Sequence, residues 1–277
     1  MNPLDFRPLS LGEILDRAFT LYRHHFVLFV ALAGIPRIPS LALGLFQVQN
    51  GPVVLPHQLS STDIWITLLG IAVALVSYLY AQGGAVIAVS ELYLGRSISI
   101  GQALRRVTSE ILSLFGVAVL NGLAIVGATM LLIIPGLYLA CRLLVCIPAA
   151  LIEQRGPRDS LSRSMALTKG FAGRSALIWI MYVAISIGVG LLVGIPMAAV
   201  LEADRADPAA FRAWGSVQAV LNVLVETLLQ PIFLIATSIF YYDLRVRKEA
   251  FDLQVMMDPD SANVPRTSHR LIVPEER

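Results

Sequence analysis

The stretch Ile64–Ser90, IWITLLGIAVALVSYLYAQGGAVIAVS, decides the fold because it contains no Asp, Glu, Lys, Arg or His side chain. A helix rises about 1.5 Å per residue and the hydrocarbon core of a bilayer is about 30 Å thick, so a helix of this length crosses a membrane. The composition agrees, since 56% of the 277 residues are hydrophobic and only 14% are charged. The sequence therefore predicts an integral membrane protein.

Five further apolar stretches accompany this one, and together they predict an all-α polytopic membrane helix bundle of about six transmembrane helices. Pro135 and Gly136 leave only a tight turn between the third and fourth spans, which should form an antiparallel hairpin. We expect residues 1–250 to form one integral membrane domain and the polar, proline-containing residues 251–277 to form a disordered cytoplasmic tail. The predicted spans cover residues 26–48, 64–90, 111–134, 137–152, 176–201 and 214–241.

Basic residues are concentrated in alternate connections of this topology. The segments before the first span and after the second, fourth and sixth spans contain 17 of the 21 Lys and Arg residues. Because basic residues are retained on the cytoplasmic side, both termini should be cytoplasmic and the number of crossings even. Mixed charge before the first apolar stretch, and Pro36 and Arg37 within it, favour a retained span over a cleaved signal peptide.

A weak repeat runs through the connections that we expect to be cytoplasmic. Ser10–Arg17 (SLGEILDR) is similar to Ser99–Arg106 (SIGQALRR), and Ser160–Arg163 (SLSR) begins a third copy. Each copy begins with Ser, a favoured helix N-cap, and apolar residues follow at helical spacing. The pattern predicts amphipathic interfacial helices at residues 10–24, 99–109 and 160–170, each followed by a two-span hairpin. The alternative is that each copy is a cytoplasmic extension of the following span.

Charged side chains within the spans are costly in hydrocarbon and raise a functional hypothesis. Arg37 and Glu226 lie at a similar middle depth and can pair, while Arg142 can join them or extend to the outer interface. One interpretation is a salt bridge with amide hydrogen bonds that holds the helices in register. The other is a polar pocket for a lipid headgroup, ion or small solute. The predicted intramembrane polar cluster consists of Arg37, Arg142, Gln218, Asn222, Glu226 and Gln230.

The sequence offers little material for catalysis. Its four His residues all lie outside the predicted spans, and no pair of intramembrane carboxylates is present to act as acid and base. Cys141 and Cys146 fall on different faces of one predicted helix. We therefore expect no enzyme activity, cofactor or metal, and the net charge of +2 does not indicate a nucleic-acid partner.

Several segments resemble the bacterial family known as the membrane domain of glycerophosphoryl diester phosphodiesterase. They are Leu9–Phe19 (LSLGEILDRAF), Tyr93–Arg96 (YLGR) with Ser99–Leu104, Gly136–Leu139 (GLYL) with Arg142, and Tyr241–Glu249 (YYDLRVRKE). The resemblance implies a multi-pass protein of the bacterial cytoplasmic membrane. In some members of the family a soluble barrel supplies the catalytic acids and metal ligands, and this sequence contains no segment that matches it. The resemblance therefore implies no catalytic residue here.

The sequence as a whole indicates a membrane-embedded module that interacts with the lipid bilayer, with anionic lipid headgroups or with a protein partner, including a second copy. A small transporter with a polar pathway along the sixth span is the alternative function, and a membrane phosphodiesterase is a third. The arginines either attract anionic lipid, at about 1 kcal/mol each, or only set the topology. The predicted anionic-lipid surface consists of Arg96, Arg105, Arg106, Arg155, Arg158 and Arg163.

Overall fold

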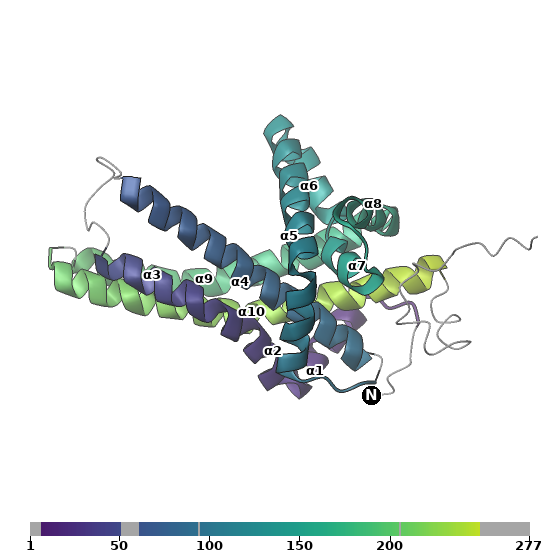
Figure 1. Ribbon diagram of the computed structural model, residues 1–277, viewed down its shortest axis with the longest axis horizontal. Helices are drawn as coiled ribbons and strands as arrows, with labels where there is room; N and C mark the ends of the chain where they lie inside the picture. The colour runs from purple at the N-terminus through teal and green to yellow at the C-terminus, as the bar shows by residue number, and fades with distance from the viewer. Residues whose placement is uncertain (1–6, 51–60, 94, 205, 250–277) are drawn as a thin grey trace, which may run out of the picture.

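A computed structural model describes residues 7–50, 61–93, 95–204 and 206–249, and these residues form an all-helical protein (Figure 1). Within the described chain, six helical segments are long and apolar enough to cross a membrane: Phe26–Asn50, Ile64–Tyr93, Ile100–Leu131, Ile133–Glu153, Ala172–Ala203 and Pro208–Glu249. The predicted all-α polytopic fold is thereby confirmed, and a lipid bilayer is the environment that such helices require. The tail predicted at residues 251–277 lies outside the described residues.

The described residues form ten α-helices and one 3-10 turn. In chain order they are α1 (Leu11–His24), α2 (Phe26–Gly34), the 3-10 turn η1 (Ile35–Arg37), α3 (Ile38–Asn50), α4 (Ser61–Tyr93), α5 (Ile100–Leu131), α6 (Ile133–Arg142), α7 (Cys146–Glu153), α8 (Pro157–Thr168), α9 (Ala172–Ala203) and α10 (Pro208–Glu249).

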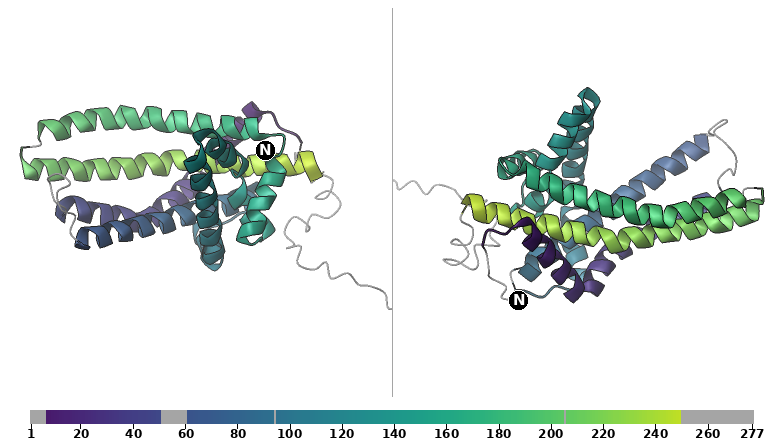
Figure 2. Two further views of the ribbon diagram at one scale, coloured as in Figure 1. Left: turned by 90° about the horizontal axis from the view of Figure 1, so that it is seen from above. Right: turned by 180° about the vertical axis from the view of Figure 1, so that it is seen from behind.

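Helix α10 is the element around which the others pack. Its 42 residues span about 63 Å by helical rise, twice the thickness of the hydrocarbon core, so part of it extends beyond the hydrocarbon. It contacts α1, α2, α3, α4, α7, α8 and α9, and α9 runs beside it (Figures 1 and 2). Residues 234–246 of α10 are all buried and form the centre of the main hydrophobic core. We call this stretch the hub.

The hairpin of α5 and α6 projects from the core in a different direction from the other long helices (Figures 1 and 2). The buried side chains of α5 all lie between Ala103 and Val117. Beyond them the hairpin exposes apolar side chains, such as Leu131 at 82%. The chain turns at Leu132, and a Cβ on Gly136 would lie only 2.7 Å from the Cα of Thr129. The predicted hairpin is therefore present, and glycine permits its close approach.

The first predicted span is interrupted by a proline. Pro36 lies in η1, between α2 and α3, and has no N–H to continue the α-helical hydrogen bonds. The guanidinium of Arg37 donates a 2.5 Å hydrogen bond to the carbonyl of Ala33 in the preceding turn. The side chain of a buried arginine thus supplies a donor beside the interruption.

The fourth predicted span consists of two helices, α6 and α7. The chain leaves the helix at Leu143–Val145 because Pro148, in the first turn of α7, cannot continue an unbroken ladder of hydrogen bonds. The carbonyl of Arg142 at the end of α6 accepts hydrogen bonds of 2.9 Å from the hydroxyls of Ser164 and Thr168. Helix α8 therefore satisfies a carbonyl at the end of α6.

Of the three surface helices predicted from the repeat, two are present as separate helices and one is not. Helices α1 and α8 are separate helices, but residues 99–109 form the beginning of α5, which continues unbroken to Leu131. The prediction of a separate helix there was wrong, and the alternative of an extended span is correct. The physical reason is that no proline interrupts residues 100–131.

Only two of the three serines that begin the repeat copies cap a helix. Ser10 and Ser99 form capping boxes with Glu13 and Gln102, so the similarity of these two copies reflects a shared way of beginning a helix. Ser160 lies inside α8, where its hydroxyl donates a 2.8 Å hydrogen bond to the carbonyl of the N-cap, Gly156. The expectation that Ser160 caps a helix was wrong, because α8 begins earlier, at a proline suited to the first helical position.

Candidate functional site

Arg37 and Glu226 form an ion pair between η1 and α10. The Nε of Arg37 lies 3.6 Å from Oε2 of Glu226, and the two side chains are 7% and 66% exposed. The Arg37 guanidinium also donates hydrogen bonds to the carbonyl of Ala33 and to Oε1 of Gln230. The protein therefore holds the arginine on three sides, whereas the carboxylate stays accessible.

A cavity of about 430 Å³ opens beside this ion pair. Asn222, Glu226 and Gln230 of α10 line it, as three members of the predicted polar cluster. The sequence did not single out Tyr78 of α4 or Tyr182 of α9, which also line the cavity. Both tyrosines lie within apolar stretches and carry no periodic polar signal, so only the packing of α4 and α9 against α10 reveals them.

Two members of the predicted intramembrane cluster lie elsewhere. Arg142 donates hydrogen bonds to the hydroxyls of Tyr138 at 2.8 Å and Thr168 at 3.0 Å, and to the carbonyl of Met165. The break after α6 places Arg142 against α8, so the prediction that it joins the cluster was wrong. Gln218 does not line the cavity, because it lies two helical turns, about 12 Å, before Glu226.

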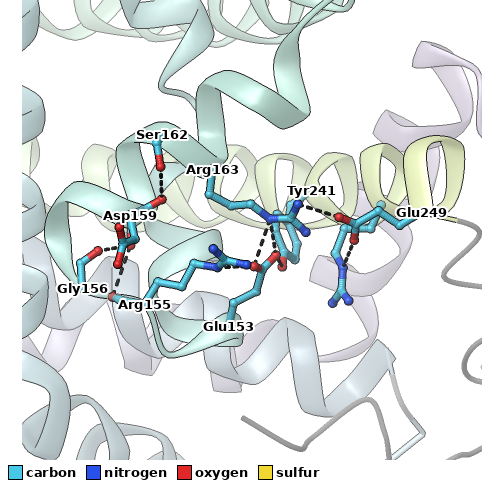
Figure 3. A network of polar contacts seen from close by, with 10 residues as sticks. Glu153, Arg155, Gly156, Asp159, Ser162, Arg163, Tyr241 and Glu249 are labelled. Atoms are coloured by element: carbon cyan, nitrogen blue, oxygen red, sulfur yellow. Dashed lines mark hydrogen bonds and ion pairs between the residues drawn. The ribbon is translucent and has the colours of Figure 1, made fainter. Parts of the chain in front are cut away.

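The six arginines predicted to form one anionic-lipid surface belong to different environments. Arg163 is only 14% exposed and lies between Glu153, at 2.8 Å, and Glu249, at 2.5 Å (Figure 3). Burial acts to lower the pKa of Arg163, but the hydrogen bonds to Glu249 and Glu153 outweigh it and raise the pKa. Arg155 also pairs with Glu153, at 2.6 Å. Assigning Arg163 to an exposed basic surface was therefore wrong, because its charge is used within the protein.

Glu153 ends α7 and is the centre of this network. Besides its two arginine partners it accepts a 2.8 Å hydrogen bond from the hydroxyl of Tyr241, which lies in the hub. Its side chain is 11% exposed, so these donors replace most of the water that a carboxylate would otherwise bind. The network joins α7 and α8 to α10.

Three other arginines gather where α4 meets α5. Arg106 and Arg96 both pair with Glu91, the latter at 3.9 Å. The exposed Arg105 lines a cavity of about 480 Å³ together with Arg106, Glu91 and the polar side chains of Ser97, Gln102 and Ser109. Arg105, Arg106 and Glu91 line the cavity and Arg96 also pairs with Glu91, so positive charge is in excess here. We call this cavity the α4–α5 basic pocket.

A buried carboxylate that the sequence analysis did not single out joins the first described residues to α10. The side chain of Asp243 is 0% exposed and accepts hydrogen bonds from the N–H of Leu9 at 2.7 Å, from Arg174 at 3.1 Å and from Arg247 at 2.9 Å. Both arginines also donate to the Leu9 carbonyl, each at 2.7 Å. We call this arrangement the Asp243 clamp.

Tyr241, Asp243 and Arg247 all lie in Tyr241–Glu249, the last part of α10. Its first six residues belong to the buried hub. Charged residues at the end of an apolar helix are typical of a solvated end, so the burial of this stretch is not predictable from its residues alone.

Comparisons with protein-family models, with curated proteins and with solved structures found no match for this chain. Within the described residues, no group of three or more His, Cys, Asp and Glu side chains is placed to hold a metal ion.

Proposed function

We propose that this chain is a non-enzymatic membrane module that binds anionic lipid headgroups at the α4–α5 basic pocket. The observation that carries the proposal is the exposure of Arg105 in a cavity that it lines with Arg106, where Glu91 is the single carboxylate. A phosphate oxygen accepts hydrogen bonds from guanidinium, hydroxyl and amide groups, and all three kinds line this cavity. Glu91 restrains Arg106, so Arg105 is the arginine that we expect to bind the headgroup.

The proposal includes an orientation, with α1, α8 and the α4–α5 basic pocket at the cytoplasmic face of a bacterial cytoplasmic membrane. Two observations support it. Basic residues are concentrated in the connections at this side of the topology, and Leu9 and Asp243 join the two ends of the described chain. Accessibility of single cysteines introduced at Arg158 and Arg212 to a membrane-impermeant reagent tests it, because the two should react from opposite sides.

The lipid test compares two arginines that carry the same charge and differ in position. Arg105→Gln removes the exposed charge from the α4–α5 basic pocket, and Arg158→Gln removes an exposed charge from α8. In phosphatidylcholine nanodiscs containing phosphatidylglycerol, Arg105→Gln should weaken phosphatidylglycerol binding about fivefold, since one arginine near anionic lipid contributes about 1 kcal/mol. Arg158→Gln should change it much less. Equal effects would show diffuse attraction, and no effect of Arg105→Gln would refute the proposal.

A second candidate function is a small transporter, and one specific observation favours it. Three side chains of the polar stripe on α10 line the 430 Å³ cavity beside Arg37, so a polar compartment exists among apolar helices. Solute flux into proteoliposomes that Glu226→Gln abolishes would support transport. Flux equal to that of empty vesicles across a panel of cationic, anionic and neutral solutes would argue for the lipid-binding module.

A further inference from the structure

We propose that the cavity beside Arg37 and Glu226 binds an ammonium group, carried either by an ethanolamine lipid headgroup or by a free organic amine. The inference does not depend on the α4–α5 basic pocket, because different helices line the two cavities and their accessible charges have opposite signs. It assigns a ligand class to an intramembrane cavity whose polar residues would otherwise serve only to hold helices together.

The charge of Arg37 is not available to a ligand. Its side chain is 7% exposed, its Nε faces Glu226, and its two terminal nitrogens donate to Ala33 and Gln230. An anionic ligand would have to displace these internal partners, which would leave the Ala33 carbonyl and the Gln230 amide without their donor. The cavity therefore does not favour a phosphate or a carboxylate.

Glu226, by contrast, lacks sufficient partners. Its side chain is 66% exposed, and the 3.6 Å separation from Arg37 exceeds the length of a hydrogen bond. A carboxylate among membrane-spanning helices is costly unless charge and hydrogen-bond donors compensate it. An ammonium group supplies one positive charge and up to three donors, which is what this carboxylate needs.

The remaining lining groups suit the same ligand. The rings of Tyr78 and Tyr182 are electron-rich surfaces that attract cations, most strongly where water is scarce. Ser186 has a buried hydroxyl oxygen without a hydrogen-bond partner, and Asn222 offers an amide oxygen. The volume of about 430 Å³ falls within the range of small-molecule sites.

The experiment measures binding by the full chain in phosphatidylcholine nanodiscs. Phosphatidylethanolamine is the lipid probe, phosphatidylglycerol is the lipid of opposite character, and ethanolamine in solution is the free amine. The wild-type protein should prefer phosphatidylethanolamine over phosphatidylglycerol at this site, and Glu226→Gln should reduce binding of the amine at least tenfold. Glu110→Gln makes the same chemical change in α5, away from the cavity, and should leave the amine bound.

A second pair of variants keeps the test decisive if Glu226→Gln folds poorly. A Cβ on Gly190, which lines the cavity, or on Gly188, which does not, would meet no atom within 4 Å. Gly190→Leu should therefore obstruct the cavity and reduce amine binding without altering its charges, whereas Gly188→Leu should not.

The outcomes separate the two sources of the ammonium group. Preference for the lipid with no binding of free ethanolamine assigns the site to a headgroup, and the reverse assigns it to a solute; both support the proposal. Phosphatidylethanolamine binding that Gly190→Leu leaves unchanged, together with no binding of ethanolamine, would overturn it. Amine binding that is unchanged in both Glu226→Gln and Gly190→Leu would overturn it as well.

Discussion

The carboxylate of Asp243 and the backbone N–H of Leu9 are joined by a 2.7 Å hydrogen bond, although 234 residues separate them in the sequence. The contact fixes the residues that precede α1 against the hub of α10. Arg174 at the start of α9 donates to the same two residues, so the clamp also positions α9. One buried carboxylate therefore holds three parts of the chain in register.

Replacing Asp243 by Asn should destabilise the protein by about 3–5 kcal/mol, because it leaves Arg174 and Arg247 with no buried charge to pair with. The measurement is the free energy of unfolding in detergent micelles. Asp16→Asn makes the same change at an exposed position of α1 and should stay within about 0.5 kcal/mol of the wild type. Similar losses in both variants would contradict a specific role for the clamp.

Removing the hydroxyl of Tyr241 should destabilise the junction of α7, α8 and α10. Tyr241→Phe deletes a donor to the carboxylate of Glu153, and hydrogen bonds to charged groups contribute about 1.5–3 kcal/mol. Tyr80→Phe deletes an exposed hydrogen bond between neutral groups and should cost less than about 1 kcal/mol. Thermal unfolding of the two variants compares the sites, and an equal decrease would show that Glu153 does not depend on the hub.

Two glycine substitutions in the α5–α6 hairpin should change stability in opposite directions. In Gly136→Ala the new Cβ lies 2.7 Å from the backbone of Thr129, so the hairpin must open, at about 1–3 kcal/mol. In Gly127→Ala the new Cβ meets no atom within 4 Å inside a helix, so the change should stabilise α5 by about 0.5–1 kcal/mol. Denaturant unfolding measures both, and equal signs would contradict the observed packing.

The beginning of α1 should weaken in acid. The backbone N–H of Ser10, together with Arg7, lowers the pKa of Glu13 from 4.5 to about 2. Because the pKa is lower in the folded protein, this stabilisation is fully present above about pH 4.5 and is lost as the pH falls toward 2.

Hydrogen exchange of the first amides of α1, corrected for the intrinsic rate, measures this loss. Glu13→Gln keeps a capping box of the kind that Gln102 forms in α5 but has no charge to lose. The protection of the first amides of α1 should therefore not change with pH in this variant. An identical acid profile in that variant would refute the assignment to Glu13.

The parts of the fold that depend on local sequence were predictable. Membrane-spanning length follows from uninterrupted apolar composition, as in Ile64–Ser90, and the helix starts at Ser10 and Ser99 follow from residues three positions apart. The pairing of Arg37 with Glu226 was also anticipated, because two opposite charges at one depth have few other partners in hydrocarbon.

The remaining contacts depend on which elements pack against each helix, and the sequence of a single helix does not specify its neighbours. Arg142 turns toward α8 because the chain breaks just after it, and the sequence around Pro148 does not specify the direction of the new helix. The burial of Asp243 depends on Leu9 and Arg174, which come from distant parts of the chain. The helical rise gives depth along a span, but it does not give the neighbour on each side.

The position of the hub near the end of the described chain has a consequence for biosynthesis. At about 5–20 residues per second, a ribosome adds Asp243 on the order of tens of seconds after Leu9. During that interval the core-facing side chains of α1, Ile14 and Ala18, have no α10 to pack against. Lipid or the insertion machinery must therefore cover these side chains until α10 has been made and packs against them.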